Sequence, residues 1–229
     1  MHMALQKVSP ICPTSFKAKA LLWDMDGILF DTEKRSIDSI IDIISRQGLS
    51  ITREYIIAHM GLGPKDLLRA YQNHLGPTFD AQLYWDTYWQ ERNAHYDACG
   101  MPLMHGALEL LRAAQEKQIP CILASSSPQK QAIKSLEHAG VYAYFSGVVG
   151  GDMFEHAKPE PDIYLTAAKL ARIPVQDCLV MEDSLNGLIS GRSAGTRTIM
   201  IPDVVPYSGA HMSYCDFLGD TLADAIALL

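Results

Sequence analysis

Short apolar runs recur along the chain, and segments with helical periodicity separate them. Because these runs show no polar face, we predict buried strands at residues 20–23, 119–124, 147–149, 178–181 and 198–201. Apolar residues three or four positions apart predict helices over residues 106–114, 129–139, 159–172 and 185–193. A strand-like turn near residues 214–217 and a helix through Leu228 end the pattern. This alternation predicts an α/β fold with a doubly wound parallel sheet.

Residues 33–99 depart from this alternation, because they contain no convincing strand. Apolar positions predict four helices in this segment, near residues 37–44, 52–60, 67–71 and 80–95. Gly100 and Pro102 suit a hinge at its end. We therefore predict three parts of the chain: a flexible leader of residues 1–19, an α/β core of residues 20–32 and 100–229, and an inserted helical cap of residues 33–99.

The last helix of the predicted cap carries four aromatic residues at helical spacing, which are Tyr84, Trp85, Tyr88 and Trp89. Such a stripe could line a ligand site or fill the inside of a small helical bundle. We interpret it as the inside of the bundle, because aromatic side chains dominate the energetics of protein cores.

Charge and composition exclude several classes of protein. The 229 residues carry a net charge of −7, whereas a nucleic-acid-binding protein would normally present a basic field. No apolar run approaches the roughly 18 residues of a membrane-spanning helix, and the first residues lack the apolar stretch of a signal peptide. The cysteines form no zinc motif, and they are Cys12, Cys99, Cys121, Cys178 and Cys215. We expect a cytoplasmic protein, monomeric or weakly dimeric, that binds neither nucleic acid nor membranes.

Two aspartates follow the first predicted strand directly. Asp24 and Asp26 stand two residues apart, so their side chains point the same way while the chain is extended, and Gly27 allows a sharp turn after them. Open α/β sheets bind ligands beyond the carboxyl ends of their strands, so this pair could act together on one reacting atom. The same residues are common in ordinary turns, and alone they do not establish catalysis.

The ends of two later strands carry a hydroxyl pair and a lysine. Ser125 and Ser126 stand before Pro128, where they could cap a helix or, with free backbone N–H groups, bind an anion such as phosphate. Lys158 stands just before another helix, which is unfavourable for a cation because of the helix dipole. It is either an ordinary surface lysine or a residue that reaches an anion between the strand ends.

A further strand ends in two adjacent acids, Glu182 and Asp183. They could simply favour the start of the next helix, or they could be oxygen ligands close to Asp24 and Asp26 that hold Mg²⁺. Each of the four strand ends is weak evidence alone. Together, and in this order, they provide the parts of a phosphoryl-transfer site.

In these motifs the sequence resembles the haloacid dehalogenase superfamily, specifically the β-phosphoglucomutase-like phosphatases with a helical cap. The resemblance covers nearly the whole chain from about Ala20 onward. The motifs that carry it are Asp24-Met25-Asp26-Gly27, Ser125, Lys158-Pro159, Glu182-Asp183-Ser184 and Asn186-Gly187. The resemblance implies a phosphoric monoester hydrolase that uses Mg²⁺.

The resemblance also implies a role for each matching residue. Asp24 would be the nucleophile that becomes an aspartyl phosphate, and Asp26 would protonate the leaving group and then activate water. Mg²⁺ would be held by Asp24, by the backbone carbonyl of Asp26 and by Asp183, with Glu182 in support. The phosphoryl oxygens would be held by Ser125, Ser126 and Lys158.

The expected substrate is a small phosphorylated metabolite, with a sugar phosphate as the first candidate. A phosphosugar mutase is the alternative, but Pro64 stands where the mutase has an arginine, and Ser36 stands where it has a histidine. Both departures favour a phosphatase. A non-catalytic binding protein would lack a motif residue, and none is missing. Lys65 and Arg92 are the cap cations that we expect to influence specificity.

Overall fold

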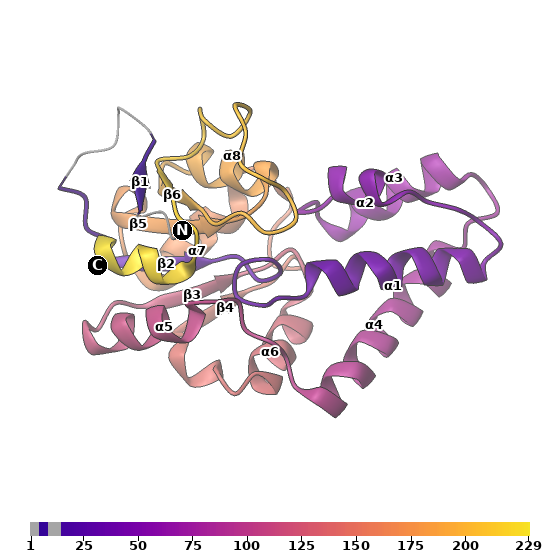
Figure 1. The fold of residues 1–229 in the computed structure, drawn as a ribbon, viewed down its shortest axis with the longest axis horizontal. Helices are drawn as coiled ribbons and strands as arrows, with labels where there is room; N and C mark the ends of the chain where they lie inside the picture. Colours follow the sequence, from indigo (N-terminus) through magenta and orange to yellow (C-terminus); the bar gives the residue numbers. More distant parts are fainter. Residues whose placement is uncertain (1–4, 9–14) are drawn as a thin grey trace.

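In the computed structural model, which describes residues 5–8 and 15–229, the chain forms one sheet with helices on both faces and a group of helices beside it (Figure 1). The sheet of the described residues has the strand order β1-β7-β6-β5-β2-β3-β4. Its strands are Gln6–Lys7 (β1), Ala20–Trp23 (β2), Cys121–Ala124 (β3), Gly147–Val149 (β4), Cys178–Glu182 (β5), Arg197–Met200 (β6) and Phe217–Leu218 (β7). Neighbouring strands run parallel except for β1, which pairs antiparallel with β7. The predicted α/β fold is confirmed.

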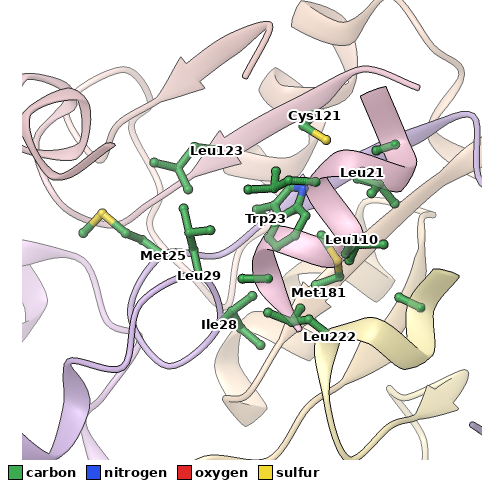
Figure 2. Packing of buried hydrophobic residues seen from close by; sticks show 14 of the residues in the cluster. Leu21, Trp23, Met25, Ile28, Leu29, Leu110, Cys121, Leu123, Met181 and Leu222 are labelled. Carbon is green, nitrogen blue, oxygen red and sulfur yellow. The ribbon is translucent and has the colours of Figure 1, made fainter. Parts of the chain in front are cut away.

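Alternate residues of the central strand β2 enter two different cores, because successive side chains of a strand point to opposite faces. Leu21 and Trp23 belong to the larger cluster, which Figure 2 shows with Leu110 and Met181 beside them. Ala20 and Leu22 belong to the cluster on the other face. Such burial on both faces explains why the predicted strands have no polar side.

Helices cover both of these cores. The larger cluster is covered by helix α5 (Ala107–Glu116), by part of α6 (Gln129–His138) and by the 3₁₀ helix η3 (Leu222–Leu228). Helix α7 (Asp162–Ala171) covers the opposite face, and α8 (Leu185–Ser193) packs beside β6. Across the described ranges, no helix has both the length and the apolar character needed to cross a bilayer.

Residues 33–99 form four helices, which are α1 (Glu33–Arg46), α2 (Arg53–Ala58), α3 (Pro64–Leu75) and α4 (Ala81–Cys99). They share a hydrophobic cluster of their own, separate from the two cores of the sheet. Side-chain caps begin two of them: Thr52 accepts a hydrogen bond from the backbone N–H of Tyr55, and Asp80 accepts one from that of Leu83.

The described part of residues 1–19, which we predicted as a flexible leader, makes contacts with the core. Gln6–Lys7 adds an edge strand to the sheet, with Gln6 opposite Leu218. Lys17 Nζ donates to the carbonyl oxygen of Ala227 at 3.0 Å. A strand of two residues is too short to leave a periodic pattern, so the sequence carried no sign of it. Residues 1–4 and 9–14, Cys12 among them, lie outside the described residues.

Candidate active site

The register of the sheet brings the predicted site residues to one edge. Trp23 in β2 is paired with Met181 in β5 and with Leu123 in β3. The residues that follow these strands therefore meet at the carboxyl edge of the sheet. Gly27 is needed there because its φ is +80°, and because a Cβ atom at this position would lie 2.6 Å from Asp183 Oδ2.

Lys158 connects the groups that arrive from three different strand ends. Its Nζ lies 2.5 Å from Asp24 Oδ1 and 2.6 Å from Glu182 Oε1, and its side chain is only 1% exposed. The Tyr164 hydroxyl donates to the same Glu182 oxygen at 2.6 Å, and Ser184 Oγ donates to the other at 2.9 Å. Glu182 is therefore held firmly in place. Burial alone would lower the pKa of Lys158, but Asp24 and Glu182 raise it above its usual value.

The carboxylates at this edge form a cluster suited to a divalent cation. Oxygens of Asp24, Glu182 and Asp183 lie within 4.8 Å of one another. Burial, helped by the nearby Glu182 and Asp26, raises the pKa of Asp24 to about 7 although Lys158 opposes the shift. Burial and neighbouring acids also raise the pKa of Asp183 well above its usual range. Buried, mutually repelling oxygen ligands of this kind fit Mg²⁺, which prefers carboxylates, water and phosphate oxygens.

Glu33, the first residue of α1, is part of this cluster and was missed by the sequence reasoning. It is 4% exposed and lies against Asp183. Burial, followed by repulsion from Asp203 and Asp26, raises the pKa of Glu33 to about 9. An acid in the first turn of a helix is ordinary because of the helix dipole, so nothing in the sequence distinguished it.

These pKa shifts predict how the stability of the metal-free protein depends on pH. The Asp24 pKa is about 7 in the folded chain against 3.8 for the ordinary group, so the folded state keeps a proton that the unfolded state has lost. Stability should therefore fall as pH rises between these two values. In chelator, the Tm of the wild type should fall between about pH 4 and pH 7 by about 5 °C or more beyond any fall in the Tm of Asp24→Asn. Thermal melts of both proteins test this, and parallel Tm curves would contradict it.

Asp26 lies beside the cluster and is tied to the cap. Its Oδ1 accepts hydrogen bonds from Thr32 Oγ1 at 2.5 Å and from Arg92 Nη2 at 3.1 Å. Arg92 also donates to Ser135 Oγ of α6 at 3.2 Å. The side chain of Arg92 is 6% exposed, and its guanidinium is hydrogen-bonded to Asp26 and to the core helix α6. Lys65, the other cap cation that we predicted, is exposed and does not line the cavity between the sheet and the cap.

A cavity of about 150 Å³ lies between the carboxylate edge of the sheet and the cap. Asp24, Asp26, Ser125, Ser126 and Asp183 line its core side. Its cap side includes all four aromatic residues of the stripe in α4, namely Tyr84, Trp85, Tyr88 and Trp89. Tyr84 also belongs to the cap cluster, as we predicted for the whole stripe. The stripe therefore fills the bundle with one part of its surface and faces the cavity with another.

In addition to the bond between Arg92 and Asp26, hydrogen bonds join the cap to the core at two further places around this cavity. On one side, Ser126 Oγ donates to the carbonyl oxygen of Gly61, in the loop between α2 and α3, at 3.3 Å. On the other side, α4 contacts α6, where Asn93 Nδ2 donates to Gln131 Oε1 at 3.2 Å. Asp97 extends this second contact by pairing with Lys134.

The residues of this site lie within a segment that matches a known protein family. The model of the haloacid dehalogenase-like hydrolase family matches residues 21–201, which contain every charged residue of the site. The chain belongs to this family. It is a hydrolase, and named phosphatases among its relatives agree with the expected class of phosphoric monoester hydrolase.

Individual relatives extend this result. The chain is 31% identical to the "Probable pseudouridine-5′-phosphatase" of Drosophila melanogaster, over 82% of this chain and 83% of that protein. It is 30% identical, over 81% of its length, to Protein SUPPRESSOR OF QUENCHING 1, chloroplastic, of Arabidopsis thaliana, but it spans only 18% of that longer protein.

Solved structures share the fold. A mutant of CbbY from Rhodobacter sphaeroides, in complex with xylulose-(1,5)bisphosphate, superposes with a TM-score of 0.78 at 23% identity, over 90% of this chain and 95% of that chain. β-Phosphoglucomutases are also among the structural neighbours. At these identities the likeness confirms the expected resemblance to the β-phosphoglucomutase-like branch at the level of the fold.

Proposed function

We propose that the protein is a Mg²⁺-dependent phosphatase that hydrolyses a small phosphorylated metabolite through an aspartyl phosphate on Asp24. Sugar phosphates are the first class to test. The observation that carries the proposal is the position of Lys158 Nζ, 2.5 Å from Asp24 Oδ1, beside carboxylates whose oxygens lie within 4.8 Å of one another. An anionic phosphate can approach an aspartate only where cations offset their repulsion.

In the proposed first step, an Asp24 carboxylate oxygen bonds to phosphorus while the bond from phosphorus to the ester oxygen breaks. Asp26 gives its proton to the departing alkoxide. Lys158, with Ser125 and Ser126, holds the phosphoryl oxygens. Asp24, Asp183 and the backbone carbonyl of Asp26 would hold Mg²⁺, supported by Glu182, and the bound ion would supply positive charge that stabilises the transition state.

In the proposed second step, Asp26 takes a proton from a water molecule as that water attacks the phosphorus of the aspartyl phosphate. The phosphoryl group leaves as inorganic phosphate, and the Asp24 carboxylate is regenerated. The proton on Asp26 is then ready for the next ester. Thr32 and Arg92 hold the Asp26 side chain for both transfers.

The cavity supports hydrolysis over mutase chemistry. A mutase must hold a second phosphate away from the reacting one, which calls for a cation at the far end of the site. Within the described part of the chain, no lysine or arginine lines the cap side of the cavity.

We also propose that the enzyme acts in the cytoplasm as a monomer or weak dimer, with residues 33–99 as the cap of a core formed by residues 20–32 and 100–229. The separate hydrophobic cluster of α1 to α4 supports this division. Cys99, Cys121, Cys178 and Cys215 are free thiols, which suits a reducing compartment.

Phosphate release from a panel of sugar phosphates tests the proposed reaction. We expect release with Mg²⁺, its loss in chelator and its return when Mg²⁺ is restored, because the carboxylates cannot hold a phosphate without the ion. Isomerisation of a sugar phosphate, primed by a bisphosphate and without phosphate release, would show a mutase instead. Full activity in chelator would overturn the metal dependence.

A further inference from the structure

We infer, on the basis of the proposed phosphatase activity, that the leaving group of the preferred substrate carries a flat aromatic ring, as in a nucleoside monophosphate or a phosphorylated pyridine alcohol. Open-chain and hydroxyl-covered sugar phosphates are then hydrolysed too, but with a lower kcat/KM. The inference rests on the wall of the cavity that faces Asp24.

That wall is built from aromatic rings fixed by one another. The Trp85 and Trp89 rings meet edge to face with centroids 5.7 Å apart, and Tyr88 and Trp89 meet in the same way at 5.4 Å. All three residues line the cavity together with Asp24. Ring edges and faces held in this way offer stacking surface to a planar group and cost little entropy on binding.

Two polar groups of the cap wall are already engaged in hydrogen bonds within the cap, whereas the buried Trp89 Nε1 has no partner in the described part of the chain. The Tyr88 hydroxyl donates to Ser36 Oγ at 3.2 Å, and His59 Nδ1 bonds to the carbonyl oxygen of Tyr55 at 2.8 Å. A polyol needs free donors and acceptors for each hydroxyl that it buries, because unpaired hydroxyls in a closed site lose their bonds to water. The faces of an aromatic ring carry no hydroxyl groups and gain from leaving water.

The size of the cavity agrees with a ring. Its volume of about 150 Å³ is that of a cavity able to hold a benzene-sized group. The apolar part of its lining comes from the cap, including Ile37 and Leu67 in addition to the aromatic residues. The aspartates and most of the serines lie on the opposite side, and α1 of the cap adds Glu33 and Ser36. A ligand with a phosphate at one end and a flat ring at the other matches this division.

Paired substrates test the inference. Uridine 5′-monophosphate and ribose 5-phosphate carry the phosphate on the same sugar carbon and differ in the ring at the other end. Pyridoxal 5′-phosphate and flavin mononucleotide extend the ring-bearing set, and glucose 6-phosphate and sorbitol 6-phosphate extend the set without a flat ring. We expect kcat/KM for the best substrate with a flat ring to exceed that of the best substrate without one at least tenfold. Equal or reversed values would overturn the inference.

Trp85→Leu provides the second measurement, because it removes a partly exposed ring from the wall. The ratio of kcat/KM between the two sets should fall at least tenfold, whereas Leu83→Ala, on the exposed side of the same helix, should leave it unchanged. An unchanged ratio in Trp85→Leu would also overturn the inference. Acetyl phosphate, which has no ring and no hydroxyls, separates the two proposals: Asp24-dependent release from it keeps the phosphatase proposal even if the ring preference fails.

Discussion

Replacing Asp24 with asparagine is expected to lower phosphate release by about 10⁴-fold or more, because an amide cannot form the aspartyl phosphate. The fold should survive. Asparagine has nearly the same shape, and its amide oxygen can still accept a hydrogen bond from Lys158 Nζ, which lies 2.5 Å from the present carboxylate. The change also removes one charge from a crowded group of buried acids, so the metal-free variant should not be less stable than the wild type.

Steady-state phosphate release measures the activity of the purified variant, and urea unfolding measures its stability. Asp42→Asn is the matched control, since Asp42 is an exposed residue of α1 that pairs with Arg46 at the surface. Activity of the Asp24 variant within tenfold of the wild type would remove Asp24 from the proposed mechanism. If the variant showed no folded state at low urea concentration, the expectation that asparagine is accommodated at position 24 would be wrong.

Replacing Lys158 with methionine is expected to reduce both activity and stability. The variant leaves Asp24 and Glu182 buried without their cation, and breaking a buried ion pair from one side costs about 3–5 kcal/mol. Loss of a positive donor to the phosphoryl group should lower kcat about 10²- to 10³-fold. The Asp24 variant should lose activity but not stability, whereas the Lys158 variant should lose both. The reason is that Lys158 supplies the positive charge that balances the buried carboxylates, and Asp24 is one of those carboxylates.

Urea midpoints in chelator, together with phosphate release in Mg²⁺, provide the comparison for Lys158→Met. Lys169→Met serves as the control, since Lys169 is an exposed lysine of α7 and surface substitutions usually change stability by less than about 0.5 kcal/mol. A Lys158 variant as stable as this control would show that the ammonium is not required to balance the buried carboxylates.

The core and the convergence of its strand ends could be predicted because they depend on local pattern. Each buried strand is a short apolar run, and parallel strands bring their carboxyl ends to one edge, so Asp24 and Asp183 could be expected to meet. The edge strand β1 could not, because two exposed residues leave no periodicity. Glu33 could not be recognised either, because only the folded chain shows that it is buried against Asp183 rather than solvated.

The two roles of the α4 side chains, packing in the cap and bordering the cavity, could not be separated from the sequence. Periodicity identifies the residues of α4 that turn away from water, but it does not separate a side chain that packs in the bundle from one that borders a cavity. Trp85 and Tyr88 belong to both surfaces. The partner of Arg92 depends on contact between segments 66 residues apart, and no local signal in the sequence specifies it.

The hydrogen bond between Arg92 and Asp26 would couple an opening of the cap to the proposed proton transfers of Asp26. The hydrogen bonds of Asn93 with Gln131 and of Ser126 with Gly61 join the cap to the core at two positions beside the cavity. Opening along α6 would withdraw the guanidinium from Asp26. Bulk water that reached the phosphorylated enzyme at that moment would meet a base without its orienting partner, so hydrolysis would proceed best in the shut enzyme, with a water molecule enclosed before the cap closed.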